Sequence, residues 1–149
     1  MTFGDRILLV DDSQDDVALT LRALRKNNIT NAVDIATDGE QALQYLFGSD
    51  EAASRRTAAL PALVLLDLNM PKINGLEVLR SIRADPRTKY LPVVILTTST
   101  EERDIVNTYD LGANSFVRKP VAFDEFLEAV RLLGMYWLLV NRPAGQLHG

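Results

Sequence analysis

The fold of this chain is indicated most clearly by one short stretch, Ala62-Leu63-Val64-Leu65-Leu66-Asp67. Its first five positions are all apolar, which is typical of a strand that is buried on both faces of a parallel sheet. A single carboxylate then closes the run. The stretch therefore predicts a central parallel strand that carries an acidic residue at its carboxyl end.

Three further apolar runs end in polar residues in the same way. They are residues 6–10 before Asp11 and Asp12, residues 92–96 before Thr97, and residues 115–118 before Lys119 and Pro120. The carboxyl ends of parallel strands share one edge of a sheet, where ligands bind in open α/β folds. These endings would gather three carboxylates, a hydroxyl and an ammonium, which suit a divalent cation and a phosphoryl group.

Helical patterns alternate with the strand-like runs, as expected of an α/β fold with a parallel sheet and crossover helices. Ser13 is placed to cap the first helix, with Asp15 and Asp16 favourable in its first turn. Thr37 and Glu40 have the spacing of a capping box for the second helix. We expect one domain over residues 1–140, without internal repeats, and a disordered tail over residues 141–149.

Composition excludes several classes of function. The 149 residues include no cysteine and one histidine, His148, so disulfides, thiolate sites and histidine clusters are excluded. A net charge of −4 argues against a nucleic-acid surface. No apolar stretch is long enough to span a membrane, and nothing resembles a signal peptide. We expect a cytoplasmic protein that binds neither nucleic acid nor membrane.

The acidic endings also allow simpler explanations. Asp11 or Asp12 could cap the first helix, although Ser13 already fills that role, and Lys119 could be a solvated charge. Asp67 is harder to explain structurally, because it closes an otherwise apolar strand. Close carboxylates repel one another, and a bound Mg²⁺ with its preference for oxygen ligands relieves that repulsion. All four endings together favour a Mg²⁺ site.

The chain resembles the receiver domain of two-component response regulators, whose single-domain type is the chemotaxis protein CheY. The resemblance covers Arg6 to about Leu133. The motifs that carry it are residues 9–12, residues 66–71 with Gly75, residues 96–97 and residues 119–120. It implies a flavodoxin-like, doubly wound five-stranded parallel sheet of strand order 2-1-3-4-5, here with an extended C-terminal helix.

The resemblance also implies roles for the site residues. Asp67 would be the phosphoacceptor for a sensor histidine kinase, in a signalling protein that is no enzyme but assists its own phosphorylation and dephosphorylation. Asp12, Asp67 and the backbone carbonyl of Asn69 would bind Mg²⁺ directly, and Asp11 through a water. Lys119 would neutralise the transferred phosphoryl group, and Thr97 would hydrogen-bond it.

Further expectations from the resemblance concern the switch. Thr97 would move toward the phosphoryl group, and the fifth-strand aromatic residue, Phe116, would then turn inward. Phe116 could equally be an ordinary strand aromatic. The Lys119–Pro120 peptide bond would be cis, and Asn69 and Ser99 would tune hydrolysis of the acyl phosphate.

The C-terminal sequence predicts an interface. Residues 135–140 are six consecutive apolar residues, and one helix cannot turn all of them toward one core. With no output domain expected, we predict signalling through a surface and a homodimer that uses Tyr136, Trp137, Leu138 and Leu139. The alternative is that this segment covers the domain's own core. This ending and the long loop at residues 48–60 resemble the response regulators paired with bacterial phytochrome histidine kinases.

Two other functions compete with a phosphorylatable receiver. A Mg²⁺-dependent phosphatase or phosphotransferase of the haloacid-dehalogenase type also uses a strand-end aspartate as nucleophile. That class needs an acid two residues later, where this chain has Asn69, so we disfavour it. The second alternative, a receiver-shaped interaction module that never carries phosphate, is disfavoured by the presence of every key residue.

Overall fold

The structure, a computed structural model, describes residues 6–26, 29–48, 60–68, 70, 74–97, 111, 115–119 and 123–132. Within these ranges five parallel strands form one sheet in the order β2-β1-β3-β4-β5. The strands are β1 (Ile7–Val10), β2 (Val33–Ala36), β3 (Leu63–Asp67), β4 (Val93–Thr97) and β5 (Ser115–Arg118). The predicted doubly wound parallel sheet and its strand order are therefore confirmed.

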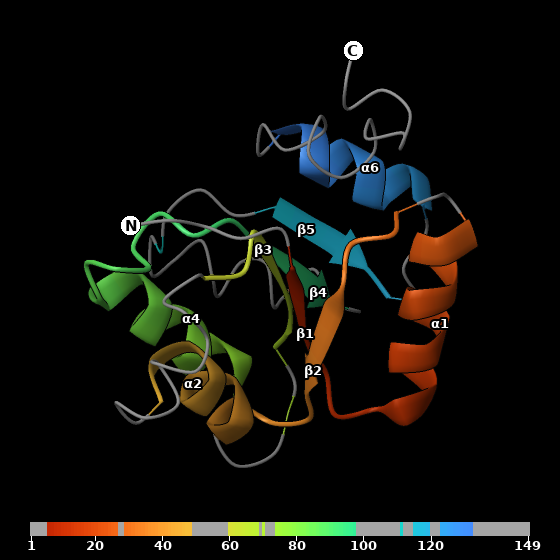
Figure 1. The fold of residues 1–149 in the computed structure, drawn as a ribbon. Coiled ribbons are helices and arrows are strands. Elements are labelled where there is room, and N and C mark those ends of the chain that lie inside the picture. Colours follow the sequence, from red (N-terminus) through yellow and green to blue (C-terminus); the bar gives the residue numbers. More distant parts are fainter. Residues whose placement is uncertain are drawn as a thin grey trace.

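Helices cover both faces of this sheet. They are α1 (Gln14–Lys26), α2 (Gly39–Phe47), α4 (Gly75–Ala84) and α6 (Phe123–Leu132). Figure 1 shows α2 and α4 on one side of the strands and α1 and α6 on the other. The predicted extension of the last helix beyond Leu132 and the predicted tail lie outside the described residues. Among the described helices, none is long and apolar enough to cross a membrane.

Two hydrophobic layers result from the alternation of side chains along β1 and β3. Leu8, Val10, Val64 and Leu66 pack on the side of α2 and α4. The intervening residues of the same strands pack with Leu24 of α1 and Phe126 of α6. Every residue from Ile7 to Val10 and from Leu63 to Leu66 is fully buried. The uninterrupted apolar runs thus reflect two covered faces, as predicted for central strands.

Polar side chains fix where the helices begin. Ser13 Oγ accepts a hydrogen bond from the Asp16 N–H, so Ser13 caps α1 as predicted. The predicted cap of α2 at Thr37 is wrong by one residue. Asp38 has the extended backbone of an N-cap and accepts from the Gln41 N–H, while the Gln41 side chain accepts from the Thr37 N–H. The helix begins one residue later because the Asp38 carboxylate, and not the Thr37 hydroxyl, accepts the hydrogen bond from its first turn.

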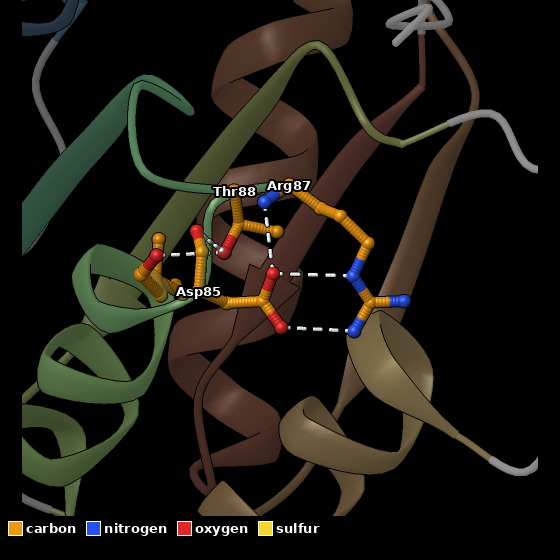
Figure 2. Close-up of polar contacts among 4 residues, drawn as sticks. Asp85, Arg87 and Thr88 are labelled. Atoms are coloured by element: carbon orange, nitrogen blue, oxygen red, sulfur yellow. Dashed lines mark hydrogen bonds and ion pairs between the residues drawn. The ribbon is translucent and has the colours of Figure 1, made fainter.

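The connection between α4 and β4, residues 85–91, is called the α4–β4 turn below. α4 ends at Ala84, and Asp85, its C-cap, has an extended backbone because the following Pro86 disfavours helical geometry there. Figure 2 shows the Asp85 carboxylate accepting from the Arg87 backbone N–H and guanidinium, and the Thr88 hydroxyl donating to the last turn of α4. The Arg87 guanidinium also lies 5.5 Å from the centre of the Phe47 ring, which links the turn to α2.

Arg83 reinforces the same turn from within α4. Its guanidinium donates to the backbone carbonyls of Leu91 at 2.8 Å, Lys89 at 3.2 Å and Leu111 at 2.8 Å. Desolvation by burial lowers the pKa of Arg83, but an arginine stays protonated across the physiological range. This arginine joins the α4–β4 turn to Leu111.

Candidate functional site

Three carboxylates meet at the carboxyl edge of the sheet. Asp67 is the last residue of β3, and Asp11 follows β1, whose Val10 pairs in register with Leu66. Asp11, Asp12 and Asp67 each offer a carboxylate oxygen, and these atoms all lie within 4.8 Å of one another. Asp11 and Asp67 are buried, whereas Asp12 is exposed. The predicted convergence of the strand endings is confirmed for these three residues.

Asp11 does not serve as the cap of α1. Its Oδ1 accepts from the Ser13 N–H at 3.0 Å, which fixes the turn after β1. Its Oδ2 is completely buried and accepts no well-aligned hydrogen bond among the described residues, although the Lys119 ammonium lies 3.1 Å away as an ion pair. A buried carboxylate oxygen with so little compensation is unusual. Together with an all-oxygen set of donors, it fits a hard divalent cation such as Mg²⁺.

Lys119 brings the positive charge into this cluster from the end of β5. Its Nζ lies 2.8 Å from Asp16 Oδ2, 3.1 Å from Asp11 Oδ2 and 3.3 Å from Asp67 Oδ2. Burial lowers the pKa of Lys119, but the hydrogen bond with Asp16 and the charges of Asp67 and Asp11 outweigh it and raise that pKa. Lys119 is therefore an ammonium at every physiological pH, and it is no solvated surface charge.

Asp16 is a member of this cluster that sequence analysis did not single out for the site. It makes the shortest of the three carboxylate contacts with Lys119. A signal was present in the sequence, because Asp16 lies one and two helical turns before Thr20 and Leu24, both of which are buried. That periodicity turns Asp16 toward the sheet at the end of α1 nearest the strand endings.

Gly75 allows the backbone of α4 to approach the end of β3. A Cβ atom at this position would lie 2.3 Å from the Asp67 carbonyl oxygen and 2.5 Å from Leu68 Cα. The Gly75 N–H donates to the Leu68 carbonyl at 3.1 Å. Gly75 therefore serves a close approach between the backbone of α4 and the end of β3.

The remaining predicted residues are described only in part. Thr97 ends β4 beside the end of β3, since Asp67 pairs in register with Leu96, and the structure describes its backbone alone. Phe116 lies half-buried on β5 and packs against the core layer of α2 and α4. The other predicted residues lie outside the described part of the chain: Asn69, Ser99, Pro120 with its predicted cis bond, Tyr136, Trp137, Leu138 and Leu139.

Known proteins are similar to this chain over nearly its whole length. The probable methanogenesis regulatory protein FilR2 of Methanothrix harundinacea is 39% identical over 93% of this chain and 87% of its own length. The response regulator Rcp1 of Synechocystis is 36% identical over 93% of this chain and 92% of its own length. The solved bacteriophytochrome response regulator AtBRR is 46% identical, with a TM-score of 0.83, and the match covers 92% of this chain and 97% of that one.

The response regulator receiver domain family matches residues 7–131, from the first residue of β1 almost to the end of α6. This span contains the acidic cluster, Gly75 and Lys119. The chain therefore belongs to the response regulator receiver domain family, the phosphorelay proteins of two-component systems.

Proposed function

We propose that Asp67 accepts a phosphoryl group from a phosphohistidine of a sensor histidine kinase. The observation that carries this proposal is the Lys119 ammonium, held 3.3 Å from the Asp67 carboxylate inside a cluster of three further acids. A nucleophilic carboxylate beside a fixed positive charge is the arrangement that phosphoryl transfer requires of a protein.

The transfer makes one bond and breaks one. An Asp67 carboxylate oxygen attacks the phosphorus atom, the phosphorus–nitrogen bond breaks, and its electron pair returns to the imidazole of the kinase. The product is an acyl phosphate on Asp67. Lys119 neutralises charge on the transferred oxygens, and the burial of Asp67, which is 4% exposed, strengthens that interaction because the local dielectric is low.

We propose Mg²⁺ as the cofactor, held by Asp11, Asp12, Asp67 and the backbone carbonyl of Asn69. When bound, the cation supplies charge neutralisation at the transferred oxygens. A solved form of Rcp1 is described as Mn²⁺-bound, which supports a divalent site in a relative of this chain. The same residues would assist loss of the phosphoryl group by hydrolysis.

The output of the switch would lie on the surface around Phe116. We propose that the Thr97 hydroxyl hydrogen-bonds the phosphoryl group and that Phe116 then turns inward from its half-buried position. Phe116 pairs in register with Ile95, two residues before Thr97 on the neighbouring strand, so the two positions are close enough to be coupled.

We propose a bacterial phytochrome histidine kinase as the partner, in the cytoplasm, where the ATP that supplies such phosphohistidines is found. The support is the name of AtBRR, a bacteriophytochrome response regulator at 46% identity. We also propose a homodimer through Tyr136, Trp137, Leu138 and Leu139, and this part rests on the apolar sequence of residues 135–140.

The function is tested by phosphorylation with Mg²⁺ and either acetyl phosphate or a phosphorylated phytochrome kinase. We expect an acid-stable, base-labile phosphate on the native chain and none on Asp67→Asn. An unlabelled native chain with both donors would contradict the proposal. Turnover of external phosphate esters would instead support the haloacid-dehalogenase alternative, which is disfavoured because Asn69 stands where that class needs an acid.

The dimer is tested separately, by light scattering at micromolar concentration. We expect a dimer for the native chain and a monomer for Trp137→Glu. A native monomer, with or without phosphate, would refute the interface without affecting the phosphoacceptor.

A further inference from the structure

Asp16 lies outside the set of residues that would bind the cation, and it makes the shortest contact in the site. Its Oδ2 is 2.8 Å from the Lys119 ammonium, compared with 3.1 Å for Asp11 and 3.3 Å for Asp67. Exposure of the side chains rises in the order Asp11 at 0%, Asp67 at 6% and Asp16 at 33%, with Lys119 at 12%. Asp16 is therefore the most solvent-exposed of the three carboxylates that hold the ammonium.

The position of Asp16 is itself fixed by the turn after β1. The Asp11 carboxylate accepts from the Ser13 N–H, and the Ser13 hydroxyl accepts from the Asp16 N–H. One chain of hydrogen bonds thus sets the spacing between a buried carboxylate and Asp16. Asp16 also lies in the first turn of α1, where backbone N–H groups carry partial positive charge and attract a carboxylate.

An ammonium group has three N–H donors, and here three carboxylates surround it. Asp11 and Asp67 are also the residues that would hold the cation, so Lys119 competes with the cation for them. Without Asp16, the coulombic attraction of the two buried carboxylates would draw the ammonium fully onto them. A partner at the rim opposes that movement and keeps one side of the ammonium directed toward the opening of the site.

We propose that Asp16 is a positioning residue for Lys119: it holds the ammonium at the rim, which leaves Asp11 and Asp67 accessible to the cation and aims the charge at an incoming phosphoryl group. This inference rests on the proposed function for its effect on phosphorylation. Its effect on the ammonium in the metal-free protein is independent of that function.

The first measurement is hydrogen exchange of the Lys119 ammonium protons by NMR in the metal-free protein. In the native chain the 2.8 Å contact should slow exchange enough for a resolved signal. Asp16→Asn should accelerate exchange or abolish the signal, and Asp16→Glu should restore part of it. Asp15→Asn is the matched control, because it removes the same charge from the same helical turn at an exposed residue. Equal behaviour of Asp16→Asn and the native chain would overturn the proposal.

The second measurement is Mg²⁺ affinity by calorimetry, followed by the rate of phosphorylation at saturating Mg²⁺. Asp16→Asn should weaken Mg²⁺ binding and slow phosphorylation, each by roughly threefold, the scale of a partly exposed ion pair. Asp15→Asn should change both by clearly less. If both variants had equal effects, Asp16 would act only through its net charge and the proposal would be wrong.

A double-mutant cycle shows whether Asp16 acts through the lysine. In a Lys119→Met background, Asp16→Asn should leave the rate of phosphorylation by acetyl phosphate unchanged. A further decrease there would contradict a positioning role. If the native chain accepted no phosphate at all, the proposed function would fail, while the exchange measurement would still decide the role of Asp16.

Discussion

The two ends of the sheet use the same residue types for different purposes. In the α4–β4 turn, Asp85 is paired with Arg87, and the buried Thr88 hydroxyl donates to the Ile82 carbonyl at 2.6 Å. At the carboxyl edge, the Lys119 ammonium contacts the carboxylates of Asp11, Asp16 and Asp67, and Asp12 lies beside Asp11 and Asp67. We call these four acids with Lys119 the acidic site.

The two ends of the sheet differ in how fully their charged groups are paired. In the α4–β4 turn the one carboxylate, that of Asp85, is paired with the Arg87 guanidinium, and this pair stabilises the fold. The acidic site retains an excess of negative charge and a buried carboxylate oxygen with no aligned hydrogen bond. A buried charge that lacks an opposite charge destabilises the folded protein. A cation that binds only the folded protein offsets this destabilisation. Each prediction below is directed at one side of this contrast.

The largest effect is expected at Gly75, where the acidic site depends on backbone contact. Gly75→Ala would place a methyl group 2.3 Å from the Asp67 carbonyl oxygen, and neither backbone can yield easily. We expect a loss of about 3 kcal/mol in the free energy of unfolding, measured in urea, together with weaker Mg²⁺ binding. A loss below about 1 kcal/mol with normal Mg²⁺ binding would show that the two backbones are not rigidly apposed.

Mg²⁺ should stabilise the protein by binding the acidic site. At a concentration about a hundred times Kd, we expect a gain of about 2.7 kcal/mol in the free energy of unfolding. Asp12→Asn should reduce this gain. In the absence of metal it should be at least as stable as the native chain, because it removes an exposed charge from a repulsive cluster. If Asp12→Asn were less stable than the native chain without metal, repulsion among the carboxylates of the acidic site would be contradicted.

Thr88 tests the compensated side of the comparison. Thr88→Val keeps the shape but removes the hydroxyl that donates to the Ile82 carbonyl, at a side chain that is 1% exposed. We expect a loss of about 1–2 kcal/mol in the free energy of unfolding, measured in urea. Phosphorylation should be unchanged at a temperature where the variant is folded. Thr88→Ser, which keeps the hydroxyl, should be closer to the native chain.

The smallest effect is the pH dependence of the Asp85–Arg87 pair. The hydrogen bonds from the Arg87 side chain and backbone lower the pKa of Asp85. Its contribution to stability is therefore present above the unfolded pKa of about 3.9 and is lost as the pH falls through the lower folded value. Asp85→Asn should cost less than about 1 kcal/mol near neutral pH, since the pair is exposed, and nothing in strong acid.

Urea unfolding of the native chain and Asp85→Asn at several pH values measures this difference. Arg87→Gln should lose the same pH-dependent part of its effect in acid, while the loss of its contact with Phe47 should not depend on pH. A difference that persisted below the folded pKa would assign the effect of Asp85 to its backbone contacts and not to its charge.

Sequence reasoning recovered the parts that depend on local patterns. The apolar runs located β1, β3, β4 and β5, and their polar endings located Asp11, Asp12, Asp67 and Lys119, because parallel strands must end at one edge. It misplaced the cap of α2 by one residue, since Thr37 and Asp38 are both good caps and only the geometry of Gln41 decides between them.

The contacts it missed join segments far apart in the chain. Asp16 was assigned only to the first turn of its helix, yet its partner is Lys119, which follows a different strand. Likewise, no local pattern tells that Arg83 donates to the carbonyls of both Leu91 and Leu111. Such contacts depend on how neighbouring layers pack. Hydrophobic periodicity shows which face of a helix is buried, but it does not show which residues of a distant segment that face contacts.

The central claim is that the uncompensated acidic site exists to carry a phosphoryl group on Asp67. The most direct measurement is to phosphorylate the native chain in the presence of Mg²⁺ and locate the phosphate by mass spectrometry of peptides kept at acid pH. The account predicts a single base-labile phosphate on Asp67 that disappears when Mg²⁺ is chelated before the reaction. A phosphate on any other residue would contradict it, and so would labelling of Asp67 that does not depend on Mg²⁺.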